Sequence, residues 1–236
     1  VGHEAPHFPY QGPNDPPERD EKGAHYHGHG RRREDPEAYR EMIERLDAGV
    51  GALTRALREL GLERDTLVIF TADHGAPLNA PGEGHNAPLR GGKSEVYEGG
   101  IRVPTLARWP GVLPAGASCD EPINGTDWLP TLAGATGMRV PDDRPIDGID
   151  LVPALGRGQT LPERVLGWQG NWRPEHRAVR LGPWKLIEQP AGEQSPASAE
   201  LFNLEQDPRE QHDLTQAHPD RVDELRRLGD ALDQQV

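Results

Sequence analysis

The sequence predicts an α/β protein in which a sheet is flanked by helices and is followed by a small antiparallel sheet and a closing helix. Three observations lead to this prediction: an amphipathic stretch, a short continuous apolar run directly after it, and a tail of short runs separated by turn residues. A helix followed by a buried strand is half of a parallel crossover unit. We place a first domain at 1–160 and a small α+β subdomain at 161–236.

The first helix is predicted to begin at Pro36, with Asp35 as its N-cap, and to end before Gly61. Its apolar side chains recur at spacings of three and four residues, which is the pattern of one buried helix face. The positions are Tyr39, Met42, Ile43, Leu46, Val50, Leu53, Leu57 and Leu60.

The stretch TLVIFTADHG then predicts a strand over 66–71, because four consecutive apolar residues are typical of a strand buried on both faces of a parallel sheet. Asp73 and His74 would stand beyond its carboxyl end, where such sheets bind ligands. A second strand is predicted at 103–109 and a short helix at 126–136. Residues 142–158 are predicted to be a loop.

The tail changes character after residue 160. Short runs at 164–168, 178–181, 184–188 and 200–204 are separated by turn residues, which indicates an antiparallel sheet. An amphipathic helix from Pro219 closes the chain, with one apolar side formed by Val222, Leu225, Leu228 and Leu232.

Composition excludes several classes of protein. The 236 residues carry a formal net charge of -13, which argues against a nucleic-acid binder held by phosphate contacts. No apolar run approaches the length of about 18 residues that indicates a membrane span. Cys119 is the one cysteine, so an internal disulfide framework and a multi-cysteine metal site are excluded.

Three polar clusters stand beside predicted elements: His7 in APHFP, Asp73-His74 in TADHG, and Lys93 in LRGGKSEVYEGG. A carboxylate suits a divalent cation, and an imidazole can join it or protonate a leaving oxygen. Glycines beside a lysine let an anion approach closely. Together these groups could clamp sulfate or phosphate during transfer.

Each cluster also has a simpler interpretation. Lys93 could be a solvated charge, and His7 could be a buried histidine with satisfied hydrogen bonds. Glu98 could serve only as an ion-pair partner of Arg90 or Arg102. The residues by themselves leave these alternatives open.

The motifs resemble those of the sulfatase family of formylglycine-dependent sulfuric ester hydrolases, which includes the arylsulfatases and the iduronate-2-sulfatase type. The similar segments are LRGGKSEVYEGGIRVPTLARWPGVLPAG, TADHG, APHFP, NGTDWLPTLAGATG, RPIDGIDLVPAL and ELFNLEQDPREQHDL, which together extend over nearly all of the chain. The resemblance implies an alkaline-phosphatase-like mixed sheet flanked by helices, of which 1–160 would be the C-terminal part. It also implies hydrolysis of sulfate esters, with sugar sulfates as one substrate class.

Roles follow from the resemblance position by position. Asp73 and His74 would bind a divalent metal, with Ca²⁺ as the first expectation and Mg²⁺ or Mn²⁺ as alternatives. Lys93 would contact the sulfate and its bridging oxygen, and His7 would hold the sulfate and help the alcohol depart.

A further segment, WQGNW, could contribute to substrate recognition. Trp168, Asn171 and Trp172 are therefore candidate substrate-binding residues. A small hydrophobic core suits the tryptophans as well, and we prefer that interpretation for them.

The sequence departs from the family chiefly because it has no Cys- or Ser-x-Pro/Ala-x-Arg motif, from which formylglycine is made. Cys119, in ASCDEP, lacks the arginine, and two N-terminal acidic ligands and a Lys/His pair also have no match. We therefore expect a C-terminal portion of a sulfatase that is inactive alone, with formylglycine on the missing part. Family analogy predicts export to the periplasm or beyond the cell.

The expected partner is a sulfated small molecule or carbohydrate, and the oligomeric state is left open. Two alternatives remain: a phosphoryl or phosphonate ester hydrolase of the alkaline phosphatase superfamily, and a non-catalytic binding protein derived from a sulfatase.

Overall fold

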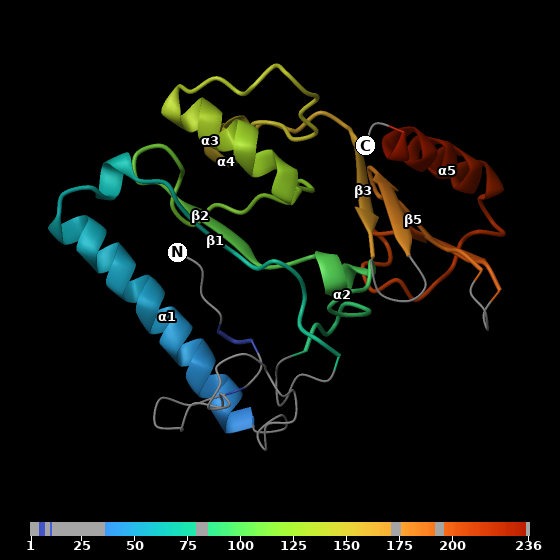
Figure 1. Cartoon of the computed structure of the whole chain (residues 1–236), viewed down its shortest axis with the longest axis horizontal. Helices are drawn as coiled ribbons and strands as arrows, with labels where there is room; N and C mark the ends of the chain where they lie inside the picture. Colours follow the sequence, from blue (N-terminus) through green and yellow to red (C-terminus); the bar gives the residue numbers. More distant parts are fainter. Residues whose placement is uncertain are drawn as a thin grey trace, which may run out of the picture.

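The computed structural model describes residues 5–7, 10, 36–78, 85–170, 176–191 and 196–234. The helices are α1 (Pro36–Glu59), α2 (Glu98–Ile101), α3 (Trp128–Thr136), α4 (Val152–Arg157) and α5 (Pro219–Asp233), with short 3₁₀ turns η1 (Glu63–Asp65) and η2 (Gly125–Asp127). The strands are β1 (Val68–Thr71), β2 (Thr105–Arg108), β3 (Val165–Gln169), β4 (Arg177–Leu181), β5 (Trp184–Gln189) and β6 (Ser198–Asn203). Figure 1 shows α1 along one side of the molecule and the β3–β6 sheet with α5 at the other.

The first helix has the predicted bounds but not the predicted burial. Gly61 ends it with φ +72, and the N–H of Leu62 donates to the carbonyl of Leu57 at 2.8 Å. Ala38 is the buried residue of α1, whereas Ile43 and Leu53 are 39% and 44% exposed. The expectation of a buried face is therefore wrong for the described part of the chain, because little of that part packs against α1.

The first sheet is a pair, β1 and β2, and not a parallel crossover. The strands run antiparallel, in a register that pairs Val68 with Arg108 and Thr71 with Thr105. Both strands are shorter than predicted, and the side chains of 68–70 are half-buried. The parallel arrangement read from this apolar run is thus not found between described strands, since the neighbour that β1 has there is β2.

The predicted helix at 126–136 is α3, and the 3₁₀ turn η2 directly before it begins with a capping box. The Asn124 side chain accepts the N–H of Thr126 at 3.2 Å, and the Asp127 carboxylate accepts the N–H of Asn124 at 2.7 Å. Asp127 is fully buried and forms a two-pronged ion pair with Arg164, just before β3. This contact joins α3 to the start of the second sheet.

The prediction of a loop over 142–158 is wrong, because α4 lies within it. The Asp150 side chain accepts the N–H of Val152 at 2.9 Å, and Gly158 ends the helix with φ +63. A proline in the first turn is compatible with a helix. These signals are present in the sequence, but the helix between them has only six residues, too few for apolar periodicity to show.

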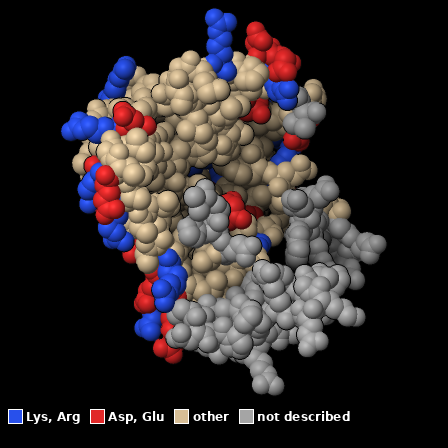
Figure 2. All heavy atoms as spheres, turned by 60° about the vertical axis from the view of Figure 1, so that its left-hand side comes forward, with Lys and Arg blue, Asp and Glu red and all other residues tan. Residues whose placement is uncertain are grey.

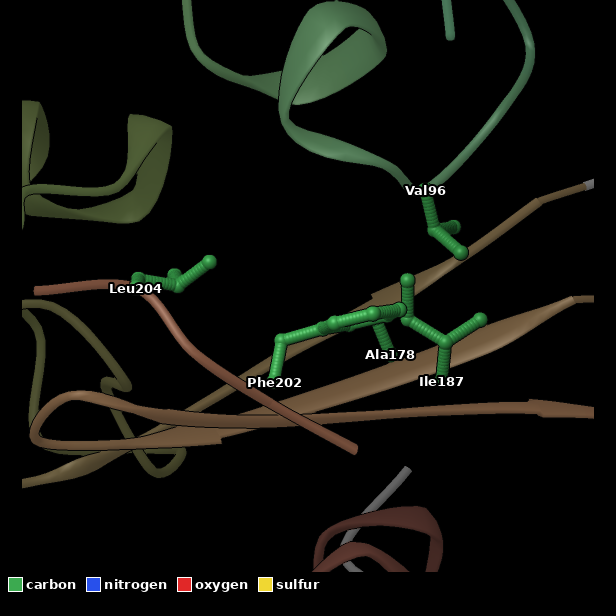
Figure 3. Packing of buried hydrophobic residues seen from close by; sticks show 5 residues of the cluster. All are labelled: Val96, Ala178, Ile187, Phe202 and Leu204. Atoms are coloured by element: carbon green, nitrogen blue, oxygen red, sulfur yellow. The ribbon is translucent and has the colours of Figure 1, made fainter. Parts of the chain in front are cut away.

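The second sheet confirms the tail prediction. Its strands are antiparallel in the order β3-β4-β5-β6. Val222 and Leu225 of α5 cover one face, where they pack against Val179, Leu186 and Leu201. Figure 3 shows Val96, from the segment before α2, reaching the other face at Ala178, Ile187 and Phe202.

Within the described ranges, no helix has the length and apolar character required to cross a bilayer. The domain boundary at 160/161 stays a prediction.

Candidate metal and oxyanion site

The acid–imidazole pair stands at the end of β1, as the sequence predicts. The Oδ2 atom of Asp73 lies 3.2 Å from Nε2 of His74, and Nδ1 of His74 lies 2.8 Å from the carbonyl oxygen of Gly75. The Asp73 side chain is 84% exposed and that of His74 33% exposed. If Nδ1 carries the proton and donates to Gly75, Nε2 keeps a lone pair beside the carboxylate.

This arrangement fits a divalent cation. Metal-binding histidines use one ring nitrogen as a ligand while the other donates to a carbonyl or carboxylate, and carboxylate oxygen suits Ca²⁺ and Mg²⁺. Asp73 and His74 offer two such donor atoms on one side. Over the described ranges no cluster of three or more His, Cys, Asp or Glu side chains forms. Further ligands would have to come from other residues.

The Lys93 turn is held next to this pair by Asn86. The N–H of Lys93 donates to the carbonyl of Ala76 at 3.0 Å. The Asn86 side chain accepts the Ala76 N–H and donates to the Ala76 carbonyl, both at 2.7 Å, and also donates to the Gly91 carbonyl at 3.1 Å. One amide side chain therefore joins the segment after His74 to the glycines before Lys93.

The backbone of this turn has an uncommon conformation. Ser94, directly after Lys93, has φ 75, and Gly91 has φ +79. A serine in the left-handed region is disfavoured, and such residues concentrate at functional sites. The Glu95 carboxylate supports the turn by accepting the N–H of Gly92 at 3.0 Å.

A broad cavity of about 1780 Å³ is lined by residues from both sheets. Its lining includes Asp73, His74 and Ser94 as well as Trp168 and Arg180 of the second sheet. In Figure 2 the charged side chains of the described residues lie mostly around the edge of this face, and a few lie beside the gap near its centre. Because Trp168 also packs against the Val96–Phe202 cluster, it combines a core role with a position on the cavity wall.

Not all predicted site residues are brought together at the cavity, because neither Lys93 nor His7 is among the residues that line it. His7 is exposed and belongs to the short described segment 5–7, so its role at the sulfate stays a prediction. Asn171 and Trp172 lie outside the described residues.

Sequence reasoning missed Asn86, whose only signal was its place in the Gly- and Pro-rich loop before Lys93. It also missed the main partner of Glu98, which is Lys185 and not Arg90 or Arg102. Glu98 hydrogen-bonds to Lys185 at 2.8 Å, while Arg102 lies 3.8 Å away.

The comparisons with known proteins identify the family of the chain. The sequence profile described as Sulfatase matches residues 1–138, and the profile described as N-sulphoglucosamine sulphohydrolase, C-terminal, matches residues 92–235. The chain belongs to the sulfatase family.

Individual relatives cover most of this chain but only part of their own length. Steryl-sulfatase of Rattus norvegicus is 37% identical over 82% of this chain and 39% of its own length. N-acetylgalactosamine-6-sulfatase of Mus musculus is 37% identical over 62% of this chain and 28% of its own length. The crystal structure of Ps i-CgsB in complex with k-i-k-neocarrahexaose superposes with TM-score 0.76 and 30% identity, over 94% of this chain and 47% of that one. The chain thus spans less than half the length of these relatives.

Proposed function

We propose that this chain forms part of a sulfuric ester hydrolase and supplies the cation- and sulfate-holding side of its active site. The observation that carries the proposal is the junction of Asp73-His74 with the Lys93 turn. Backbone and Asn86 hydrogen bonds bring the two segments together, and Asp73, His74 and Ser94 line one cavity. Family membership supports the same reaction class.

The roles follow from charge. Asp73 and His74 would hold a divalent cation, for which we favour Ca²⁺, and the cation would neutralise charge on the sulfate oxygens. The Lys93 ammonium would hold the sulfate and the bridging oxygen, where negative charge grows as the ester bond breaks. His7 would donate a proton to the departing alcohol oxygen.

The nucleophile is proposed to come from a segment outside these 236 residues. Formylglycine is made from a Cys- or Ser-x-Pro/Ala-x-Arg motif, and no such motif occurs in this sequence. The electrostatic groups of this chain cannot by themselves attack sulfur, so we expect the isolated chain to release no sulfate.

A sulfated sugar is the substrate class that we favour. One relative is named for N-acetylgalactosamine 6-sulfate, and a similar structure holds k-i-k-neocarrahexaose. In this chain Trp168 gives the cavity wall an aromatic side chain, which suits contact with a sugar ring. Trp168, Asn171 and Trp172 are the proposed substrate-binding residues.

Sulfate release from 4-nitrophenyl sulfate and from N-acetylgalactosamine 6-sulfate tests the proposal. The 236-residue chain should be inactive, whereas the protein that also contains the formylglycine motif should turn over both. Lys93→Ala should reduce kcat by roughly 10²–10³-fold, because a preorganised charge at the developing anion is lost.

The matched control is Arg40→Ala, which removes an exposed cation from α1 and should leave the rate unchanged. Equal losses in both variants, sulfate release by the isolated chain, or faster hydrolysis of a phosphate ester than of the sulfate ester would contradict the proposal.

A further inference from the structure

A fully buried ion triad lies behind the Lys93 turn. Lys185, on β5, is 0% exposed, and its Nζ lies 2.8 Å from Oε1 of Glu98 and 2.8 Å from Oε1 of Glu210. The side chains of Glu98 and Glu210 are 3% and 0% exposed. One ammonium thus joins two carboxylates from segments 112 residues apart.

Burying this triad is costly in free energy. Removing charged groups from water costs free energy that the ion pair recovers only in part, and apolar side chains of similar volume are often as stable. Burial raises the pKa of Glu210 above its ordinary value, although Lys185 opposes that shift. A role beyond stability would account for three ionisable groups at this position.

The backbone around Glu210 adds a second observation. Glu210 has φ 54, and it shares this left-handed conformation with only one other non-glycine residue of the described chain, Ser94 at the lysine turn. The conformation is disfavoured for a residue with a Cβ. It accompanies a contact in which Oε2 of Glu210 accepts the N–H of Glu98 at 2.7 Å, so Glu98 is held through both its backbone and its side chain.

Glu98 transmits this constraint to the site because it begins α2. The next residue, Gly99, donates its N–H to the carbonyl of Arg90 at 2.7 Å, at the start of the lysine turn. Gly100 accepts the N–H of Gly75, the residue after His74, at 2.9 Å. A Cβ built on Gly99 would lie 2.3 Å from the carbonyl oxygen of Gly91, so α2 and the turn touch backbone to backbone.

Neighbouring contacts fix the same segment against the second sheet. Val96 packs onto Ala178, Ile187 and Phe202 (Figure 3). Arg90 lies over the Tyr97 ring at 4.0 Å, and its Nη1 donates to the carbonyl of Glu210 at 3.1 Å. The segment from Arg90 to Glu98 therefore rests on the sheet through both apolar and charged contacts.

We propose that Lys185 is a positioning residue, which ties Glu98 to Glu210 and thereby sets the geometry of the Lys93 turn relative to Asp73 and His74. The second sheet would then act as the rigid support of the sulfate-holding turn. The inference rests on the proposed function, because that function gives the geometry of the Lys93 turn its catalytic role. The test below uses no sulfate ester. It can therefore decide the positioning role of Lys185 even if the protein hydrolyses no sulfate ester.

Two measurements on the full chain test the proposal. Amide hydrogen exchange at Gly75, Lys93 and Gly99 reports the local protection of the turn, and urea unfolding reports the stability. Lys185→Met leaves two unpaired buried carboxylates and should lower stability as well as raise exchange at the three amides by roughly tenfold. The decisive variant is the neutral triple substitution Glu98→Gln, Lys185→Met and Glu210→Gln. It should recover most of the stability while exchange at the three amides stays raised.

The matched control is Asp127→Asn, which weakens the buried pair with Arg164 but touches no part of the turn. It should raise exchange near Asn124 and Thr131 and leave Lys93 unchanged. If the triple variant restores protection together with stability, or if Asp127→Asn loosens the turn as much as Lys185→Met does, the positioning role is wrong and the triad serves stability alone.

Discussion

The two regions of the molecule differ in how they bury apolar side chains. In residues 165–234 the sheet is covered on both faces, and Leu186, Leu201 and Phe202 are 0% exposed. All of the large apolar side chains that the described structure leaves exposed lie instead between residues 43 and 138, Leu60, Leu106 and Leu129 among them at 71%, 61% and 52%.

This difference shows what supports the site. Asp73 and His74 extend from β1, in the region with the poorer cover, while the segment with Val96 and Glu98 rests on the well-packed second sheet. The turn that carries Lys93 lies between the two. We therefore expect the second sheet to set the stability of this turn.

The largest expected effect comes from removing a side chain of the second core. Phe202→Ala should lower the free energy of unfolding by about 3–5 kcal/mol, because it deletes a fully buried ring between Val96 and the sheet. Leu53→Ala on α1, where the side chain is 44% exposed, should change it by less than about 1 kcal/mol. Urea unfolding of the two variants measures the contrast, and equal losses would refute it.

A smaller effect is expected at the contact between the regions. Asp127→Asn should cost about 2 kcal/mol at neutral pH, because the charged bond to Arg164 is lost. Burial raises the pKa of Asp127, but the Arg164 guanidinium and the N–H groups of Asn124 and Ile149 outweigh it and hold the pKa below its ordinary value.

The contribution of Asp127 to stability depends on pH. The Asp127 contribution is present above the unfolded pKa of about 3.9 and is lost as the pH falls through the lower folded pKa. The stability difference between wild type and Asp127→Asn should therefore be constant from pH 6 to 8 and shrink below about pH 4. A difference that grows in acid would contradict this assignment.

The smallest effects come from a pair of helix glycines with opposite expected signs. Gly51 of α1 has open space where a Cβ would lie, so Gly51→Ala should stabilise by about 0.5–1 kcal/mol. A Cβ on Gly229 of α5 would lie 2.6 Å from Cγ2 of Val179, so Gly229→Ala should destabilise by about 1 kcal/mol. Thermal unfolding of both variants tests the pair, and a shared sign would show that the two helices are packed alike.

The sequence predicted the second region well because its signals are local. The runs that became β4 and β5 are joined by Gly182-Pro183, and the spacing of Val222 and Leu225 marks the face of α5. In the first region the same kind of pattern located α1 correctly. Periodicity indicates which face of a helix is apolar, but it does not indicate whether another segment covers that face.

The sequence proposes the chemical groups of the site, whose roles stay predictions, but it does not indicate the residues that support them. Asp73, His74 and Lys93 carry residue types whose chemistry can be read directly. Lys185 could not be linked to Glu98, because 87 residues separate them and ionisable side chains are usually expected at the surface. Asn86 gave no signal of the three hydrogen bonds that it makes.

The most direct test of the account is a calorimetric titration with Ca²⁺ of the protein that also contains the formylglycine motif. We expect a single binding event that Asp73→Asn abolishes and that Asp143→Asn, a surface aspartate paired with Arg144, leaves intact. Unchanged Ca²⁺ binding by Asp73→Asn, or an equal loss in both variants, would contradict a cation site at the end of β1.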